Sequence, residues 1–220
     1  MTRIKICGIT NSRDALNAIA AGADLLGFIF VDSSARKIDE AAAKAVIEAV
    51  GGRAKTVAVF RNSPIEDVKR IAQNLKFDYV QLHGSESPEF CRSVAAPVIK
   101  VVEIAANVDV AELARLLDSY EFCDYILFDK PKDLDFSDWL VKAIERVGRL
   151  NLKRPYFFAG GLNHANVVEV VTCISPFGVD VASGVESAPG VKEIEKMNAF
   201  CGAVRDIAVD RANVVNEAIS

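Results

Sequence analysis

The chain has 220 residues, of which 51% are hydrophobic and 25% are charged, with a formal net charge of −4. This composition is typical of a folded protein with a full core, and the length allows one large domain or two small ones. The acidic balance gives no support for a nucleic-acid partner. The longest stretch without a charged residue, 155–168, is too short and too polar to cross a membrane. The N-terminus has no apolar signal segment, so we expect a cytoplasmic protein.

Five cysteines and two histidines restrict the chemistry that this chain can perform. The cysteines are odd in number and have no paired spacing, which is typical of free thiols in a reducing compartment. No Cys/His set has the spacing of a zinc site, so we expect no metal. Acid–base chemistry must therefore use carboxylates, a thiol or one of the two imidazoles.

Short β-branched or aromatic runs alternate with longer amphipathic runs along the chain. Asn11, three residues before Asp14, predicts a helix start, and Gly22 predicts its end. Ala, Leu and Val recur at helical spacing in 41–50 and 110–117, which predicts further helices. The predicted strands are Arg3–Cys7, Asp24–Phe30, Lys55–Phe60, Tyr79–His83, Val98–Glu103, Tyr125–Asp129, Tyr156–Ala159 and Gly178–Ala182.

Eight strand–helix units of about 25 residues follow one another without a linker, which predicts a (β/α)8 barrel. We expect residues 1–220 to form this one domain, with 206–220 as a C-terminal tail or an extra helix. An open, doubly wound sheet is the alternative, but the chain has neither nucleotide motif, GxGxxG or GxxxxGK[ST]. The apolar residues at helical spacing in the tail are Val209, Ala212, Val215 and Ile219.

Side chains alternate between the lumen and the helix layer along each barrel strand, and active sites lie where the strands end. Cys7 ends the first predicted strand and is expected to face the mouth of the barrel. The other cysteines, at positions 91, 123, 173 and 201, are expected to pack as small apolar residues. The polar residues that we expect in the lumen are Lys5, Gln81, His83, Lys100, Asp129 and Asp180.

Glycines follow the last two predicted strands, in AGGL (159–162) and ASGVE (182–186). Barrels that bind phosphorylated ligands frequently hold the phosphate at these two loops. Glycine lets backbone N–H groups approach an anion, although tight turns alone would also explain it. We therefore predict a phosphate site at Gly160, Gly161, Ser183 and Gly184.

Several motifs together resemble the phosphoribosylanthranilate isomerase family of tryptophan biosynthesis. The resemblance extends from Lys5 to the last predicted helix, and the first and last motifs are its most specific parts. The motifs are KICGIT at 5–10, GADLLGFIF at 22–30, VQLHG at 80–84, ILFD at 126–129, AGGLNHANV at 159–167 and VDVASGVESAPGVK at 179–192.

The resemblance implies a cofactor-free Amadori rearrangement of N-(5-phosphoribosyl)anthranilate to 1-(2-carboxyphenylamino)-1-deoxyribulose 5-phosphate. It implies Cys7 as the base and Asp129 as the acid. A base at position 7 needs a group that favours the thiolate, and Lys5 is the candidate. An acid at position 129 must hold a proton near neutral pH, which requires desolvation or a nearby anion.

The remaining site residues are expected to bind substrate. The resemblance assigns Arg36 to the anthranilate carboxylate, although Ala35 stands where the family often has proline. Asp180 either accepts from the substrate amine or pairs with a lumen lysine. His83 lines the mouth, as a ligand of the substrate or as a structural histidine. His164 is expected to be exposed.

One segment departs from the family pattern. The loop 130–139, KPKDLDFSDW, contains no glycine where the family has a glycine-rich stretch. Closure over the substrate is therefore in doubt. Two alternatives follow: an isomerase of another phosphosugar, or a non-catalytic phosphate-binding barrel. In each case the expected partner is a small phosphorylated molecule, and the chain is expected to be a monomer or a homodimer.

Overall fold

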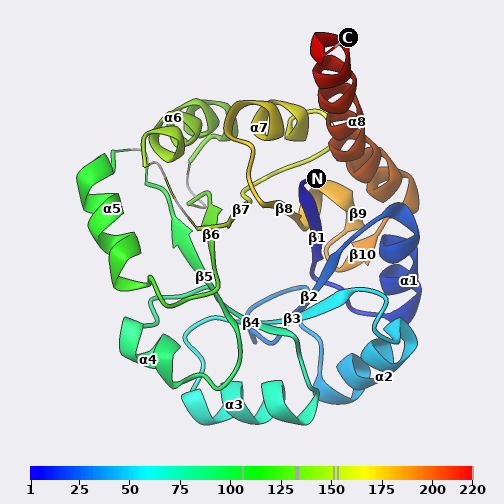
Figure 1. Ribbon diagram of the computed structural model, residues 1–220. Coiled ribbons are helices and arrows are strands. Elements are labelled where there is room, and N and C mark those ends of the chain that lie inside the picture. The colour runs from blue at the N-terminus through cyan, green and yellow to red at the C-terminus, as the bar shows by residue number, and fades with distance from the viewer. Residues whose placement is uncertain (106, 132–133, 151, 153, 220) are drawn as a thin grey trace.

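The structure is a computed structural model that describes residues 1–105, 107–131, 134–150, 152 and 154–219, and within these the side chains up to Ile207. Parallel strands pair in chain order and close into a barrel (Figure 1). The predicted barrel is confirmed, and the open sheet is wrong. The strands are β1 (Arg3–Cys7), β2 (Leu25–Ile29), β3 (Lys55–Phe60), β4 (Tyr79–Leu82), β5 (Val98–Glu103), β6 (Tyr125–Asp129), β7 (Tyr156–Phe158) and β8 (Gly178–Val181).

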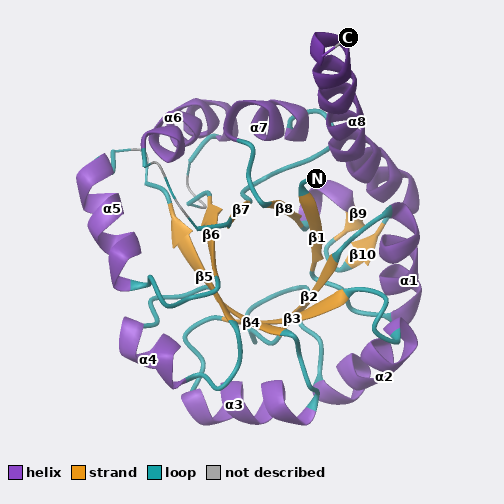
Figure 2. Cartoon of the chain, in the orientation of Figure 1, coloured by secondary structure: helices purple, strands orange, loops and turns teal. Residues whose placement is uncertain are grey.

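Helices form a ring outside the strands (Figure 2). The first begins as expected, because the Asn11 side chain accepts from the Asp14 N–H at 2.9 Å, and Gly22 ends it at φ +109°. The helices are α1 (Ser12–Ala21), α2 (Glu40–Val50), α3 (Ile65–Asn74), α4 (Pro88–Ser93), α5 (Val110–Ser119), α6 (Phe136–Arg149), α7 (Val167–Ile174) and α8 (Ile194–Ile219). A short helix, η1 (Ser183–Val185), and a hairpin of β9 (Glu186–Ala188) and β10 (Val191–Lys192) follow β8.

The apolar side chains form two layers, as strand parity requires. The larger cluster lies between the barrel and the helices and includes Ile6, Phe28 and Phe128. The smaller cluster fills the lumen, where each strand contributes alternate residues. Its buried members are Cys7, Leu25, Val57, Val59, Ile99, Val101, Leu127, Phe157 and Ala159.

Lys100 lies outside the lumen, contrary to the prediction. Ile99 and Val101 occupy the lumen of β5, while Val98 and Val102 belong to the outer cluster with the parity of Lys100. Apart from Lys100, all residues from 98 to 102 are apolar. Periodicity alone could therefore not decide whether the odd or the even positions of this strand face the lumen. The charge of the Lys100 ammonium is paired between the barrel and the helices, where its Nζ lies 2.8 Å from Oε2 of the buried Glu86.

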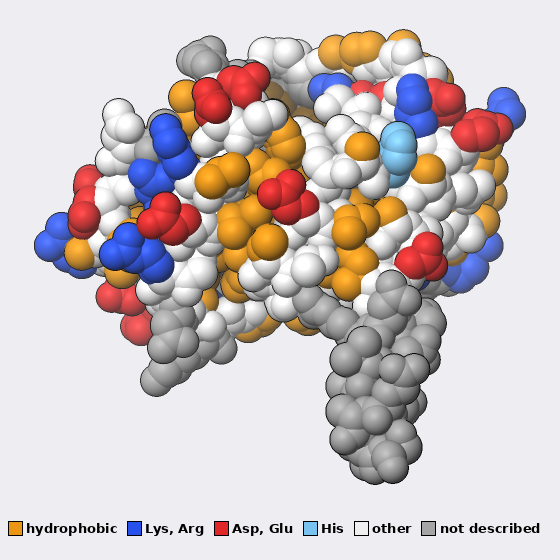
Figure 3. All heavy atoms as spheres, turned by 90° about the horizontal axis from the view of Figure 1, so that it is seen from above, with side chains coloured by type: hydrophobic (Ala, Val, Ile, Leu, Met, Phe, Trp, Pro, Cys, Tyr) orange, Lys and Arg blue, Asp and Glu red, His pale blue; other side chains and the backbone are white. Residues whose placement is uncertain are grey.

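The chain ends on one continuous helix, α8, rather than on a separate helix beginning near 206. Figure 1 shows its red end running away from the barrel. The side chains of the expected apolar stripe, Val209 to Ile219, lie outside those that the structure describes. No helix among the described residues is both long and apolar enough to span a membrane. The face in Figure 3 carries acidic and basic side chains dispersed among apolar ones.

Candidate active site

Cys7 ends β1 in the lumen with only 6% of its surface exposed. It pairs in register with Gly27 on β2. A Cβ added at Gly27 would lie 2.7 Å from Sγ of Cys7, so a glycine is needed there to make room for the thiol. The next residue, Gly8, adopts φ +79° and turns the chain out of the barrel. The predicted orientation of Cys7 toward the lumen is therefore correct.

Lys5 lies one layer below, fully buried, and pairs with Asp180 on β8. Its Nζ lies 2.9 and 3.0 Å from the two carboxylate oxygens. Of the two readings of Asp180, the structure shows the ion pair with the lumen lysine. Burial lowers the pKa of Lys5, but the charges of Asp180 and Cys7 raise it further, so Lys5 is held as a cation.

Lys5 favours the thiolate of Cys7, as expected, but it does not determine the net direction of the shift. Burial raises the pKa of the Cys7 thiol, and the charge of Lys5 lowers it only in part. Burial is the largest cause, and the negative charge of Asp180, which pairs with Lys5, also raises the pKa of Cys7. The resting group is a thiol, which becomes a strong base once it is ionised.

Asp129 ends β6, and its two carboxylate oxygens have different partners. Oδ1 accepts from the N–H of Lys130 at 2.8 Å, and Oδ2 lies 3.1 Å from Nε2 of His83, which follows β4. Both side chains are partly exposed, 18% for Asp129 and 29% for His83. Gly160 adopts φ +98°, and a Cβ there would lie 2.6 Å from Cβ of Lys130. A glycine at position 160 is therefore needed chiefly to make room for Lys130, whose N–H holds Oδ1 of Asp129.

A cavity of about 310 Å³ opens at the carboxyl ends of the strands. Arg36, His83 and Asp129, three of the predicted site residues, line it together. Sequence reasoning missed Arg61, which follows β3, and Glu103, which ends β5. Their positions at or just after the ends of strands could have indicated them. Glu103 was missed because Lys100, and not Ile99 and Val101, was predicted to face the lumen from β5.

Arg36 is held by a carboxylate of the protein. Its Nε lies 2.9 Å from Oε1 of Glu186 and its Nη2 lies 2.7 Å from Oε2, a bidentate pair. Its stem crosses Gly8, where an added Cβ would lie 2.7 Å from Cδ of Arg36. Lys192 donates from Nζ to the same Glu186 at 2.8 Å. Glu186 and Lys192 belong to the motif at 179–192, but nothing in the sequence assigned either residue a role.

The loops after β7 and β8 meet at Gly184. A Cβ at Gly184 would overlap the carbonyl oxygen of Leu162, so only glycine allows this approach. Gly161 adopts φ +77°. Within the described part of the chain, no acceptor is found for the backbone N–H groups of Gly161, Ser183 and Gly184. These N–H groups are the kind of donor that the predicted phosphate site requires, and the binding of phosphate there stays a prediction. Helix α7 follows this loop and begins at Val167.

The loop between β6 and α6 is fastened by a lysine. Nζ of Lys130 donates to the carbonyl oxygens of Pro131 and Leu134, at 2.8 and 2.5 Å. Trp139 keeps the helix start buried, with its indole N–H donating to the carbonyl of Ile104 at 2.8 Å. Residues 132–133 of this glycine-free loop lie outside the described residues.

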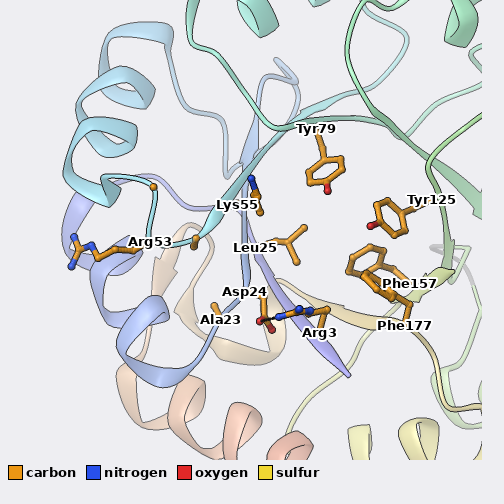
Figure 4. Close-up of a pocket in the computed structure, with 12 residues that line it drawn as sticks. Arg3, Ala23, Asp24, Leu25, Arg53, Lys55, Tyr79, Tyr125, Phe157 and Phe177 are labelled. Atoms are coloured by element: carbon orange, nitrogen blue, oxygen red, sulfur yellow. Dashed lines mark hydrogen bonds and ion pairs between the residues drawn. The ribbon is translucent and has the colours of Figure 1, made fainter. Parts of the chain in front are cut away.

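A second cavity, of about 420 Å³, lies at the opposite end of the barrel (Figure 4). Arg3, Lys55, Tyr79 and Tyr125, which begin their strands, line it with Phe177. None of the predicted site residues lines it, so the candidate site remains at the carboxyl ends. Among the described residues, no group of His, Cys, Asp and Glu could hold a metal ion.

The other singled-out residues lie away from the site. Cys91, Cys123 and Cys201 are buried as expected, whereas Cys173 is exposed on α7, contrary to the packing role expected for it. Cys173 follows the valine-rich stretch 167–172, which suggested burial, but it lies on the face of α7 that is exposed to solvent. His164 is exposed, as predicted.

Comparison with known proteins identifies the family. The family model for N-(5'-phosphoribosyl)anthranilate (PRA) isomerase matches residues 4–203. The chain belongs to the N-(5'-phosphoribosyl)anthranilate isomerase family. Among curated members, the isomerase of Geotalea daltonii is 38% identical over 209 residues, covering 91% of this chain and 95% of its own. The isomerase of Geotalea uraniireducens is 40% identical over 206 residues, covering 91% and 97%.

Solved structures of isomerases of this family have the same fold. One is a phosphoribosyl anthranilate isomerase in complex with reduced 1-(o-carboxyphenylamino)-1-deoxyribulose 5-phosphate, with a TM-score of 0.79 and 35% identity. The enzyme of Thermotoga maritima has a TM-score of 0.80 and 32% identity. Each comparison covers 94% of this chain and 100% of the other.

Proposed function

We propose that Cys7 and Asp129 catalyse the Amadori rearrangement of N-(5-phosphoribosyl)anthranilate to 1-(2-carboxyphenylamino)-1-deoxyribulose 5-phosphate, a step of tryptophan biosynthesis. The observation that carries this proposal is that β1 and β6 end on a thiol and a carboxyl group that both face the lumen, at the end of the barrel where the glycine loops lie. The reaction needs one acid and one base, and these two positions supply them.

Asp129 acts first, as the acid. Its carboxylic acid donates a proton to the ring oxygen of the ribose while the bond from that oxygen to C1 breaks. The nitrogen lone pair forms a double bond to C1, which gives the ring-opened iminium ion. The partly exposed position of Asp129 in the cavity allows contact with a sugar, and His83 and the N–H of Lys130 fix the direction of its oxygens.

Cys7 acts second, as the base. Its thiolate removes the proton on C2, the electrons of that C–H bond form the C1–C2 double bond, and the iminium electrons return to nitrogen. The resulting enolamine tautomerises to the ketone of the product. The iminium ion makes the C2 proton acidic, so a thiol whose pKa is raised by burial is matched to a step that needs a strong base.

The substrate has an anion at each end, the anthranilate carboxylate and the phosphate. The site offers a guanidinium for the first and backbone N–H groups for the second. Arg36 binds the anthranilate carboxylate, since a guanidinium matches a planar carboxylate. The N–H groups of Gly161, Ser183 and Gly184 bind the phosphate, with Gly160 shaping the loop beside them. His83 contacts the sugar from the cavity wall, and Asp180, paired with Lys5, keeps the lumen below Cys7 polar.

The chain is proposed to work in the cytoplasm as a monomer or a homodimer. All five cysteines are free thiols in this structure, which suits a reducing compartment. The related Thermotoga maritima isomerase is dimeric, and monomers of it have been generated. Sedimentation equilibrium of the purified chain separates the two oligomeric states.

The activity is tested by turnover. N-(5-phosphoribosyl)anthranilate, prepared beforehand and added without a second enzyme, loses its fluorescence as the product forms. We expect turnover without added metal or cofactor, in the presence of a chelator. Substrate loss no faster than without protein, under conditions in which another isomerase of the family works, would favour a non-catalytic phosphate-binding barrel.

A further inference from the structure

Three charged residues form a compact group beside the site. Glu186 and Lys192 come from the hairpin β9–β10, where they pair in register, and Arg36 comes from the loop after β2. The side chains of Glu186 and Lys192 are 4% and 0% exposed, whereas that of Arg36 is 26% exposed toward the cavity. A buried carboxylate between two cations leaves one positive charge in excess, and it faces the cavity.

Glu186 occupies one edge of the Arg36 guanidinium. The bidentate pair uses Nε and Nη2, while Nη1 has no hydrogen-bond partner within the described part of the chain. A guanidinium has two edges that can each bind a carboxylate, one with Nε and Nη2 and one with Nη1 and Nη2. The edge carrying Nη1 is therefore left for a ligand carboxylate, in an orientation that Glu186 sets.

Lys192 connects this pair to the position of Cys7. Its Nζ lies 2.8 Å from Oε1 of Glu186, 2.5 Å from the carbonyl oxygen of Cys7 and 3.1 Å from that of Ala182. An ammonium has three protons, and these three acceptors use all of them. One ammonium thus connects the end of β1, the end of β8 and the carboxylate that holds Arg36.

The hairpin itself is fixed to the loop after β1 and to the first turn of α1. The N–H of Lys192 donates to Oδ2 of Asp14 at 2.9 Å, and the hydroxyl of Thr10 donates to the carbonyl oxygen of Gly190 at 2.7 Å. Gly190 also donates its N–H to Oε1 of Glu186 at 3.2 Å. The carboxylate of Glu186 is therefore held from several directions and has little freedom to follow Arg36.

We propose that Glu186 and Lys192 are positioning residues: Glu186 directs Arg36 toward the carboxylate of the substrate, and Lys192 holds Glu186 and the Cys7 backbone at a fixed spacing. The inference rests on the proposed roles of Arg36 and Cys7. It makes the hairpin β9–β10 part of substrate recognition, although neither residue touches the substrate. The distance between the carboxylate anchor and the base is then set by one buried ammonium.

Ligand binding separates this role from a structural one. The probes are reduced 1-(o-carboxyphenylamino)-1-deoxyribulose 5-phosphate and the analogue that lacks its ring carboxylate, each titrated calorimetrically into wild type and E186Q. We expect E186Q to weaken binding of the carboxylated probe by about tenfold, because Arg36 loses its charged partner. Binding of the carboxylate-free probe should change less than twofold. Equal weakening of both probes would overturn the proposal.

The double variant R36M/E186Q adds an independent criterion. If Glu186 acts through Arg36, E186Q has no further effect on binding of the carboxylated probe once R36M is present. Additive losses would overturn the proposal. The matched control is E193Q, which removes a carboxylate from the same segment but one that pairs at the surface with Lys196. It should bind both probes as wild type does.

Lys192 is tested by kinetics. K192M should lower kcat more than it raises KM, because the carbonyl of Cys7 loses its donor, and K192R should recover part of kcat. Circular dichroism verifies that each variant is folded; if K192M does not fold, K192R alone decides. A rise in KM with kcat unchanged would overturn the role of Lys192. Failure of wild type to bind either probe would contradict the proposed function itself.

Discussion

Nε2 of His83 lies 3.1 Å from Oδ2 of Asp129, although His83 follows β4 and Asp129 ends β6. Strand β5 lies between β4 and β6 in the barrel. The contact of His83 with Asp129 therefore passes over the carboxyl end of β5. The second carboxylate oxygen is held by the N–H of Lys130. The carboxyl group therefore has a fixed orientation before any substrate binds, which suits a group that must protonate one particular ring oxygen.

Removal of the His83 imidazole should therefore affect the rate more than binding. We expect H83A to lower kcat by about tenfold and KM to change less than threefold, since Asp129 loses one of its two orienting partners. Steady-state kinetics with the fluorescent substrate measures both. A large rise in KM with normal kcat would instead assign His83 to substrate binding alone.

The pH profile should reflect the thiol of Cys7. Because burial raises the pKa of Cys7 above its ordinary value, the thiolate becomes the major form only at alkaline pH. We expect the rate at which iodoacetamide alkylates Cys7, followed on the peptide that contains it, to rise with pH from 7 to beyond about 8.5, the ordinary pKa of a thiol. An alkylation rate at Cys7 that is flat from pH 7 to 9 would contradict a thiol whose pKa is raised.

The contact of the two glycine loops predicts a sharp effect of one methyl group. G184A should lower the melting temperature and raise KM, because its Cβ would push the loop away from the Leu162 carbonyl. G148A is the control, since no atom lies within 4 Å of the added Cβ in α6. It should leave KM unchanged and the melting temperature equal or higher. Equal behaviour of the two variants would show that the approach at Gly184 is not required.

Acid should destabilise the fold through buried carboxylates. Burial raises the pKa of Glu86, but hydrogen bonds from Lys100 and from the N–H of Asn62 lower it further, so the folded pKa lies below the ordinary value. This stability is present above the unfolded pKa, about 4.3, and is lost as the pH falls through the folded pKa. Urea unfolding from pH 7 to 3 measures it. E86Q should be about 3 kcal/mol less stable at pH 7 and depend less on pH below 4.5.

The barrel could be predicted because its signals are local and repeated. The alternation of apolar strands and amphipathic helices depends on short-range patterns, and the bounds of β1, β3, β5 and β6 agree with the predicted ones. The inward orientation of Cys7 followed from strand parity, because β1 alternates Ile4 and Ile6 with Lys5 and Cys7, and that of Asp129 followed from its position at the end of β6. Strand β5 has apolar residues on both sides of Lys100, so parity failed there.

The partners of the site residues could not be predicted, because they depend on distances between remote segments. Lys5 and Asp180 meet through the pairing of β1 and β8, the first and last strands of the barrel. Arg36 and Glu186 are likewise remote in sequence, and nothing near either residue indicates the other. The net effect on Cys7 depends on the balance of burial and two opposite charges, which only the folded structure sets.

The acid–base assignment is tested most directly by kcat of C7S and D129N, measured beside binding of reduced 1-(o-carboxyphenylamino)-1-deoxyribulose 5-phosphate. Each substitution should lower kcat at least about 100-fold, since each removes a proton-transfer group, while binding of the probe changes less than about tenfold. Substantial turnover by both variants would contradict the roles of Cys7 and Asp129.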